Sequence, residues 1–447
     1  MPTIETAAPT LDLTQIRAQF PSLAQTVNGH PAVFLDGPGG TQVPQAVIDA
    51  ISNYLRCNNA NTGGAYATSR NTDAMIAGAR AAMADFLNCS ADEIVFGPNM
   101  TTLTFMISRA IGRELGPRDE ILVTRLDHDA NVSPWLALEE KGVTIRWAEI
   151  HQEDCTLDVE DLAAKLNSKT KIVAIGYASN AVGTINPIKE IVRLAHSVGA
   201  LAYVDAVHYA PHGLIDVKDL DCDFLVCSTY KFFGPHMGVL FGKRDHLTRL
   251  RPYKVRPLTE AVPFRWEWGT LNHECIAGIT ACVDYIADLG CNHETSGDSR
   301  LGCPSSEARP SATSPSARRA AIVAAFEAIH RHEHALMQPL INGISQIPQL
   351  KIYGITDPSA FAWRCPTLAI RAINQTNDTT PLALATKLGE LGFFTWDGNY
   401  YALNLTERLN VESSGGFLRI GLAHYNTAEE VGRLLAALRE IAAGSHL

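Results

Sequence analysis

"FLVCSTYKFFGPHMGVLFGK", residues 224–243, is the most informative stretch of this 447-residue sequence. Its two apolar runs, Phe224–Cys227 and Gly238–Lys243, are typical of buried strands. Between them stands Lys231, next to aromatic residues and ahead of a Gly-Pro break. Burial would lower the pKa of its amine toward the neutral, nucleophilic form. The stretch therefore indicates a lysine beyond the end of a buried strand whose amine takes part in chemistry.

The composition is that of an ordinary globular chain, large enough at 48.5 kDa for two lobes. The formal net charge of −10 argues against nucleic acid or an anionic membrane as partner. We find neither a membrane-length apolar run nor the pattern of a secretory signal. The ten cysteines form no C-x-x-C pair. We therefore expect a cytoplasmic protein with reduced thiols and no metal site.

The middle of the chain alternates between apolar strands and amphipathic helices. This alternation predicts a largely parallel sheet covered by helices on both faces. Ligands of such sheets bind beyond the carboxyl ends of the strands, so the residues that follow each strand are the candidates for a site. The predicted strands, besides the two above, are 93–97, 120–125, 143–150, 171–177 and 201–205, and the clearest helices are 100–115 and 188–197.

The second half of the chain predicts a smaller α+β domain. Residues 291–316 are rich in Ser, Pro and Gly and indicate a mobile surface insertion. A helical stretch, 317–344, follows it, and strands and helices then alternate to the end. We expect an N-terminal segment, 1–30, that packs on the small domain, a large domain, 31–275, and a small C-terminal domain, 276–447.

Polar residues follow five of the predicted strands. A turn with hydroxyl groups leads into a helix at Met100, and such a helix start can seat an anion. His128, Asn180, Asp205 and Lys231 follow the other strands. Each has an ordinary structural explanation, such as a cap or a buried partner. Together, a carboxylate, a lysine and an anion seat at one sheet edge indicate pyridoxal 5'-phosphate (PLP), whose ring accepts electrons when its pyridine nitrogen is protonated.

Several motifs resemble the class V aminotransferase-fold enzymes, especially cysteine desulfurases. They are "SNAVGTINPI" (179–188), the pair Asp205-x-x-His208 and Ser228-x-x-Lys231 with "GP" and "GVLFGK", "WEWGTLN" (266–272) and "RIGLAHYNTAEEV" (419–431), and they occur in the order of that family. The resemblance spans roughly residues 34–438. It implies a PLP-dependent transferase of fold type I, with a mostly parallel seven-stranded sheet, helices on both faces and a smaller α+β domain.

The resemblance also implies roles around the cofactor ring. Lys231 is expected to form the Schiff base and to carry protons. Asp205 is expected to pair with the pyridine nitrogen, and His128 to stack on the ring. His208 and Asn180 are expected near the phenolic oxygen, although desulfurases usually have glutamine where His208 stands.

Further roles concern the phosphate and the substrate. By the resemblance, Met100, Thr101 and Ser228 seat the phosphate, and Thr270 reaches the phosphate of a neighbouring subunit, which implies a homodimer. Tyr230 stands where desulfurases have histidine, and it either contacts the phosphate or packs beside the next phenylalanine. Three residues are expected to contact the substrate: Arg419, which would bind the α-carboxylate, Arg70, which would neutralise a second carboxylate or cap a helix, and Tyr400.

The main departure from the desulfurases is the missing thiol. They carry a cysteine on a loop shortly before the arginine of the last motif, whereas residues 395–418 contain none. The nearest upstream is Cys365, which we expect in the core. The resemblance then favours a branch without the catalytic cysteine: carbanion or enamine chemistry at Cβ of a small amino acid, with decarboxylation of L-aspartate and carbon–carbon bond formation to an aldehyde, as in decarboxylative aldolases of specialised metabolism. A C–S lyase that eliminates from Cβ and an aminotransferase remain alternatives.

Overall fold

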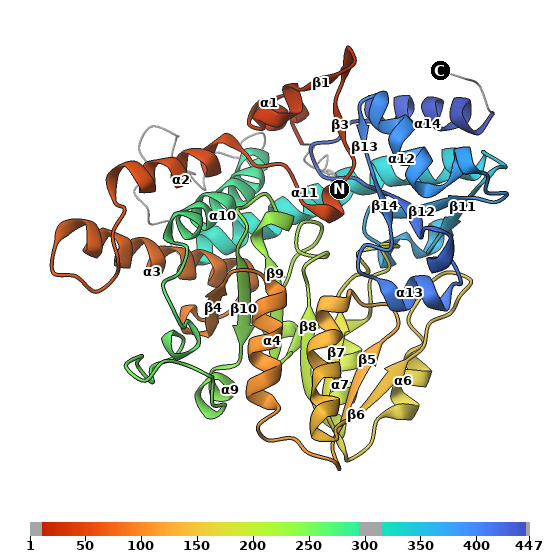
Figure 1. Cartoon of the computed structure of the whole chain (residues 1–447). Helices are drawn as coiled ribbons and strands as arrows, with labels where there is room; N and C mark the ends of the chain where they lie inside the picture. The colour runs from red at the N-terminus through yellow and green to blue at the C-terminus, as the bar shows by residue number, and fades with distance from the viewer. Residues whose placement is uncertain (1–10, 295–314, 444–447) are drawn as a thin grey trace, which may run out of the picture.

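The computed structural model describes residues 11–294 and 315–443, and its largest element is a seven-stranded sheet (Figure 1). All its strands run in parallel except β10, which is antiparallel to both its neighbours. This confirms the predicted fold class. The strand order is β4 (Ile94–Gly97), β10 (Gly238–Gly242), β9 (Phe224–Ser228), β8 (Leu201–Asp205), β7 (Thr170–Gly176), β5 (Glu120–Thr124) and β6 (Thr144–Ala148).

Helices cover both faces of this sheet because alternate strand residues point to opposite sides. Ile172 and Ala174 pack with α4 and α5, whereas Val173 and Ile175 pack in the core that holds α3, α7, α10 and α11. The helices of this region are α2 (Gln45–Cys57), α3 (Ala67–Leu87), α4 (Met100–Ile111), α5 (Ser133–Leu136), α6 (Val159–Lys165), α7 (Ile188–Ser197), α8 (Val217–Leu220), α9 (Arg244–Arg249), α10 (His273–Glu294) and α11 (Pro315–Ser345).

A second, four-stranded antiparallel sheet has its own core against α11, α12 and α14. In Figure 1 these C-terminal elements lie together at one end of the molecule. A capping box between Thr427 and Glu430 begins α14. The elements are β11 (Leu350–Tyr353), β12 (Thr367–Ala372), β15 (Phe417–Gly421), β14 (Trp396–Gly398), α12 (Pro381–Glu390), α13 (Leu403–Arg408) and α14 (Ala428–Ala442).

The N-terminal part of the chain joins both regions. In α1 (Leu13–Ala18), the Arg17 side chain donates to the Tyr425 carbonyl at 2.7 Å and pairs with Glu430 at 2.9 Å. After the short β1 (Thr26–Val27) and β2 (His30–Pro31), β3 (Val33–Phe34) pairs in parallel with β13 (Phe393–Phe394). Residues 33 and 34 thus pair with a strand of the C-terminal region, although the sequence places them in the large domain. The three-part division of the chain stays a prediction.

Several predicted boundaries change. The insertion expected at 291–316 is too wide, because α10 continues to Glu294 and α11 starts at Pro315; residues 295–314 lie outside the described part. The helix expected over 100–115 ends at Ile111, before Gly112. Eight cysteines are free thiols, but Cys291 is disulfide-bonded, so the expectation of reduced thiols is wrong there: composition does not show which sulfurs meet in space. None of the described helices is long and apolar enough to cross a membrane.

Candidate active site

A cavity of about 280 Å³ lies where the large sheet meets the small one. The carboxyl ends of β5, β7 and β8 and the loop after β9 form its floor, and β15 and the turn after β14 form the opposite wall. Ten of the predicted site residues line it: Met100, Thr101, His128, Asn180, Asp205, His208, Tyr230 and Lys231, together with Tyr400 and Arg419 from the opposite wall.

Lys231 ends the single 3-10 turn that follows β9. Its Nζ donates to the carbonyl of Pro38 and lies 4.9 Å from the ring centre of Tyr230. Burial, and after it the positive charge of Arg419, lower the pKa of Lys231 to about 7. A large fraction of the amine is therefore neutral and nucleophilic near neutral pH.

Asp205 ends β8, and its side chain is almost fully buried, with 7% of the residue exposed. Its Oδ1 accepts a hydrogen bond of 2.9 Å from the Val207 amide. Burial raises the pKa of Asp205 to about 6, although Lys231 opposes the shift. A buried carboxylate with so little compensation is suited to a cationic partner inside the cavity.

His128 is the N-cap of the 3-10 turn after β5. Its Nδ1 accepts from the Ala130 amide at 3.0 Å, so a neutral ring carries its proton on Nε2. Burial, followed by the charge of Lys231, lowers the pKa of His128 to about 4. The Tyr401 ring stacks on it at 5.4 Å and 26°. A neutral, flat ring thus forms one wall of the cavity.

Arg419 of β15 reaches the cavity from the small sheet and is buried. Its Nη1 donates to the Asn180 carbonyl at 2.9 Å, and its guanidinium carbon lies 4.1 Å from the ring centre of Tyr400. Asn180 in turn donates from Nδ2 to the Tyr400 carbonyl at 2.9 Å. Burial lowers the pKa of Arg419 to about 10, so the group stays charged at neutral pH. It can bind a carboxylate through two parallel hydrogen bonds.

The predicted phosphate seat lies at the start of α4. The Met100 amide donates to the Ser228 hydroxyl at 3.1 Å, which brings two of the predicted residues together, and Thr101 lines the cavity beside them. Tyr230 does not simply pack beside Phe232: its ring lines the cavity and stacks on His236 at 4.8 Å.

Two predicted site residues, Arg70 and Thr270, lie outside this cavity. Arg70 is exposed, donates to the Ala65 carbonyl and does not line the cavity. Thr270 is exposed and lines other hollows of the surface. Their roles stay predictions, and that of Thr270 depends on a second subunit.

Sequence reasoning missed several residues of the cavity. Asp127 accepts from the Gly176 amide at 2.5 Å, and burial raises its pKa well above the usual range. Asp127 directly precedes His128 after the same strand, so its place at a strand end could have identified it. Trp396 and Tyr401 also line the cavity, but they come from a turn whose place no sequence pattern predicts.

The cavity fits PLP on observations from this chain. Three buried polar atoms on its walls have no partner: Asn180 Oδ1, His208 Nε2 and Arg419 Nε. The residues that would hold the group are Lys231 for its aldehyde, Asp205 for its pyridine nitrogen, His128 for its ring face and the start of α4 for its phosphate. When bound, PLP supplies an electron sink for charge that develops on the amino acid.

The fold and the site together define a PLP-dependent enzyme of fold type I. The family model for aminotransferase class-V matches residues 33–301 and 319–434. The chain belongs to this family, and PLP is its cofactor.

The curated relatives include enzymes named cysteine desulfurase. That of Pectobacterium atrosepticum is 31% identical, over 96% of this chain and 98% of its own length. A probable cysteine desulfurase of Halalkalibacterium halodurans is 30% identical, over 95% and 97%. The fold matches that of a cysteine desulfurase structure from Thermococcus onnurineus, with a TM-score of 0.79, 23% identity and coverage of 95% and 98%.

Proposed function

We propose that the protein breaks a bond between Cβ of a small α-amino acid and a substituent, and releases that substituent without loading it onto a thiol of its own. The observation that carries the proposal is the lining of the catalytic cavity, which contains no cysteine among the described residues. Cys365 lines a different cavity, and burial raises its pKa well above the usual range. A thiol with so high a pKa is a poor nucleophile.

The charges of the cavity assign an orientation to the substrate. Arg419 would bind the α-carboxylate from the small-sheet side. Lys231, which lies on the side of the large sheet, is the base for the proton at Cα, because its pKa of about 7 lets it both accept and return a proton. Asp205 would stabilise the positive charge on the cofactor nitrogen while negative charge develops on the substrate.

Two substrate classes fit this chemistry. The names of the curated relatives favour a sulfur substituent, as in cysteine or an S-substituted cysteine. The absent thiol favours L-aspartate, whose β-carboxylate leaves as neutral CO₂ and whose Cβ can then take up a proton or add to an aldehyde. We place elimination of sulfur first, because the names of the relatives favour a sulfur substituent, and aspartate decarboxylation second.

One incubation series separates the candidates. The holoenzyme is given L-cysteine, S-methyl-L-cysteine or L-aspartate, and sulfide, methanethiol, pyruvate, alanine and CO₂ are measured. Sulfide or methanethiol with pyruvate supports the first candidate, and alanine with CO₂ from aspartate the second. A protein persulfide found by mass spectrometry after cysteine would contradict both. Amino transfer to a 2-oxo acid, with accumulation of the pyridoxamine form, would make the protein an aminotransferase instead.

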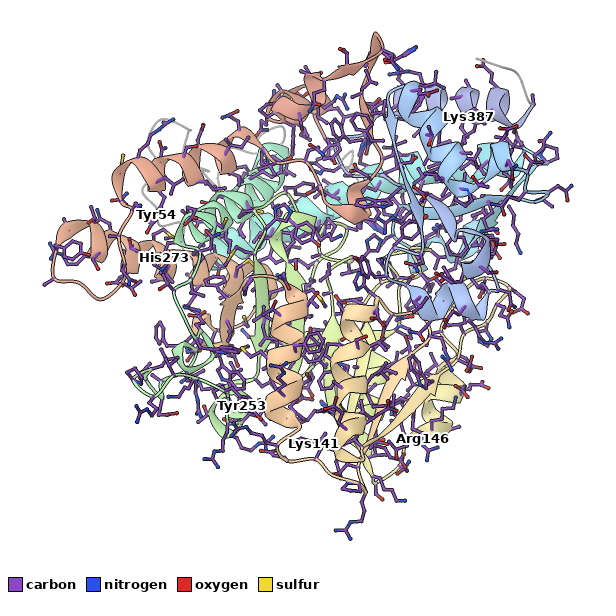
Figure 2. The ribbon with its side chains drawn as sticks, viewed as in Figure 1. Tyr54, Lys141, Arg146, Tyr253, His273 and Lys387 are labelled. Atoms are coloured by element: carbon purple, nitrogen blue, oxygen red, sulfur yellow. The ribbon has the colours of Figure 1, made fainter. Side chains whose placement is uncertain are left out.

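We also propose that the enzyme is a homodimer. The segment that carries Thr270 exposes large apolar side chains, and Tyr253 lies at the periphery of the molecule (Figure 2). Several exposed large apolar side chains on one segment are typical of an interface. The exposed apolar residues of the segment are Tyr253, Val255, Phe264 and Trp268. A second copy seated there would cover them and would let Thr270 act in the neighbouring site.

A further inference from the structure

Two aromatic side chains stand at the outer end of the catalytic cavity and are largely exposed. Trp396 of β14 and Tyr401 of the following turn both line the cavity, yet 52% and 70% of these residues are exposed. Large aromatic rings supply much of the apolar area that folding and binding bury, and exposed ones beside a cavity indicate a binding surface.

The Tyr401 ring is held in place. Tyr400 and Tyr401 have φ angles of 55° and 60°, a left-handed conformation that non-glycine residues adopt where their surroundings impose it. The Tyr401 amide donates to Asn399 Oδ1 at 3.0 Å, and its carbonyl accepts from the Asp129 amide at 2.7 Å. Its ring stacks on His128, as described above. The exposed face of this ring is therefore a fixed feature of the cavity mouth.

Trp396 is fixed in a different way. A Cβ atom built on Gly39 would lie 2.9 Å from two carbons of the indole, so the indole rests directly on the Gly39 backbone. Trp396 is also the cross-strand partner of Arg419. Because cross-strand partners point to the same face of a sheet, the indole lies next to the guanidinium that would bind the substrate carboxylate.

The charges of the cavity lie at its inner end. Of the described lining residues, Lys231 and Arg419 are the lysine and arginine, and Asp127 and Asp205 are the acids. All four are shielded enough for burial to shift their pKa values. The outer end offers aromatic faces instead, which favour a flat and uncharged group.

We propose that Trp396 and Tyr401 form an aromatic subsite that receives a flat, uncharged group at Cβ of the substrate. The inference rests on the proposed function and adds a substrate class to it. The group has two conceivable sources: the amino acid's own Cβ substituent, as in an S-aryl or S-benzyl cysteine, or a second reactant that joins Cβ, such as an aromatic aldehyde. Both present the same apolar ring to the subsite.

The test compares matched ligands on holoenzyme variants. The changes are Trp396→Ala, Tyr401→Ala and the conservative Tyr401→Phe, with Trp363→Ala as a control that removes an exposed tryptophan outside this cavity. Dissociation constants for S-benzyl-L-cysteine and S-methyl-L-cysteine come from the absorbance of bound PLP. In parallel, product formation from L-aspartate is measured with benzaldehyde or acetaldehyde.

In each alanine variant, the dissociation constant of S-benzyl-L-cysteine should rise, or product formation with benzaldehyde should fall, about three- to tenfold. The values for S-methyl-L-cysteine and acetaldehyde should change less than about twofold. Tyr401→Phe and Trp363→Ala should behave like the unchanged protein. A selective effect on S-benzyl-L-cysteine assigns the group to the amino acid, whereas an effect on benzaldehyde alone assigns it to a second reactant.

Equal weakening of large and small ligands, or no change in either alanine variant, would overturn the subsite. If Tyr401→Ala fails to fold, the result for Trp396→Ala alone tests the subsite. Failure of the proposed function is a separate result: it would appear as a lack of turnover with every substrate, and the difference in dissociation constants between the two cysteine derivatives would still be measurable.

Discussion

At the residue scale, Lys231 and Asp205 are the groups whose protonation the fold alters most usefully. Burial moves the pKa of the lysine down to about 7 and that of the aspartate up to about 6, so the two values approach each other. At pH 7 the amine is therefore about half neutral, whereas the carboxyl is still mostly ionised. With PLP bound, Lys231 would hold its aldehyde and Asp205 would pair with its ring nitrogen.

The lysine shift predicts how the cofactor-free protein captures PLP as pH changes. With a pKa near 7, the neutral fraction rises about tenfold between pH 6 and pH 8 and then levels off. A lysine with the usual pKa would rise about a hundredfold over the same interval without levelling. Stopped-flow absorbance measures the capture rate, and Nα-acetyl-lysine in the same buffers corrects for titration of PLP itself. A continued rise above pH 8 would contradict the lowered pKa.

Asp205→Asn tests the other half of the pair. The amide keeps the size of the side chain but lacks the negative charge, so we expect PLP to remain bound and turnover to fall at least about tenfold, or about 1.4 kcal/mol in barrier height. Bound PLP is measured by absorbance after dialysis, and kcat with the best substrate found above. Near-normal kcat would remove Asp205 from its role, and loss of PLP alone would make it a binding residue.

At the element scale, the turn that follows β14 sets the position of Arg419. The Tyr400 ring lies under the guanidinium, and its hydroxyl donates to the Phe417 carbonyl, with the Trp396 carbonyl as a second acceptor within reach. Tyr400→Ala should raise KM for the amino acid about three- to tenfold with little change in kcat, because it removes a buried cation–π contact. Tyr400→Phe keeps the ring and should have a smaller effect. A fall in kcat at constant KM would contradict a positioning role.

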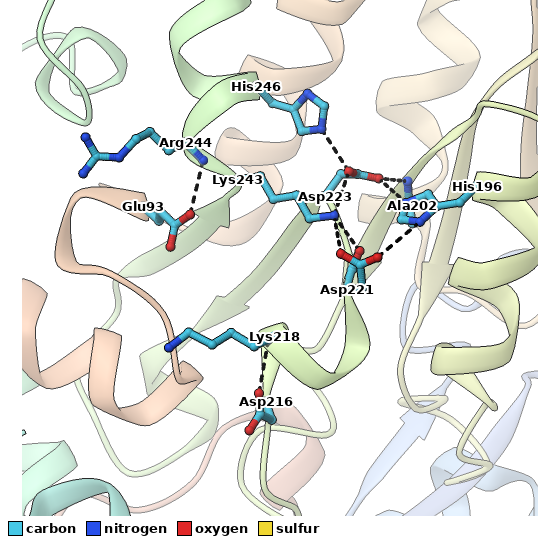
Figure 3. Close-up of polar contacts among 10 residues, drawn as sticks. All are labelled: Glu93, His196, Ala202, Asp216, Lys218, Asp221, Asp223, Lys243, Arg244 and His246. Carbon is cyan, nitrogen blue, oxygen red and sulfur yellow. Dashed lines mark hydrogen bonds and ion pairs between the residues drawn. The ribbon is translucent and has the colours of Figure 1, made fainter. Parts of the chain in front are cut away.

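At the amino ends of the parallel strands, away from the cavity, a charge cluster is centred on Asp223 (Figure 3). Its Oδ1 and Oδ2 lie 2.9 Å from His246 and His196, Oδ2 accepts from the Ala202 amide at 2.8 Å, and Lys243 is 3.3 Å away. These partners overcome burial and hold the pKa of Asp223 well below its usual range. The cluster thus ties α7, β8 and α9 to the residue that precedes β9.

Removing this carboxylate should destabilise the protein in a pH-dependent way. Asp223→Asn should lower the free energy of unfolding by about 2 kcal/mol at neutral pH. Because the folded-state pKa lies below the unfolded one, the difference is full above about pH 4 and shrinks as pH falls further. Urea unfolding at pH 7 and pH 3 measures it. The matched control is Asp221→Asn, whose side chain is 67% exposed and which should cost no more than about 1 kcal/mol. Equal losses in both variants would contradict the role of burial.

The sequence predicts an element well when the interactions that form it are between residues close together in the chain, and poorly when they join distant residues. The strands that end at Asp205 and near Lys231 were predictable, because each is a short apolar run and parallel strands place their ends together. The Trp396–Tyr401 turn was not. Its place over the cavity depends on hydrogen bonds to loops more than 200 residues away, such as that between Asn180 and Tyr400, and on positive φ angles that no local pattern announces.

At the scale of the whole molecule, the catalytic cavity exists only because distant parts of the chain meet. Asp205 ends a strand of the large sheet and Lys231 lies just beyond another, whereas Arg419 belongs to the small sheet and Tyr401 to the turn after β14. Pairing of β3 with β13 and the contact of Arg17 with Tyr425 fasten the N-terminal part of the chain to the C-terminal region. Motifs in the sequence predict which residues belong to the site, but packing between the two sheets decides which of their side chains share one cavity.

The proposed homodimer gives the last prediction. Val255 is a large apolar residue of the segment that carries Thr270, and it is exposed in the single chain. Val255→Glu would bury a charge in the interface, so it should turn dimers into monomers and, by removing Thr270 from the neighbouring site, weaken PLP retention. Light scattering after size-exclusion chromatography gives the mass, and absorbance gives bound PLP. Trp363→Glu places the same charge on an exposed aromatic residue away from that segment and should leave the dimer intact. A Val255→Glu protein that stays dimeric with full PLP would place the interface elsewhere.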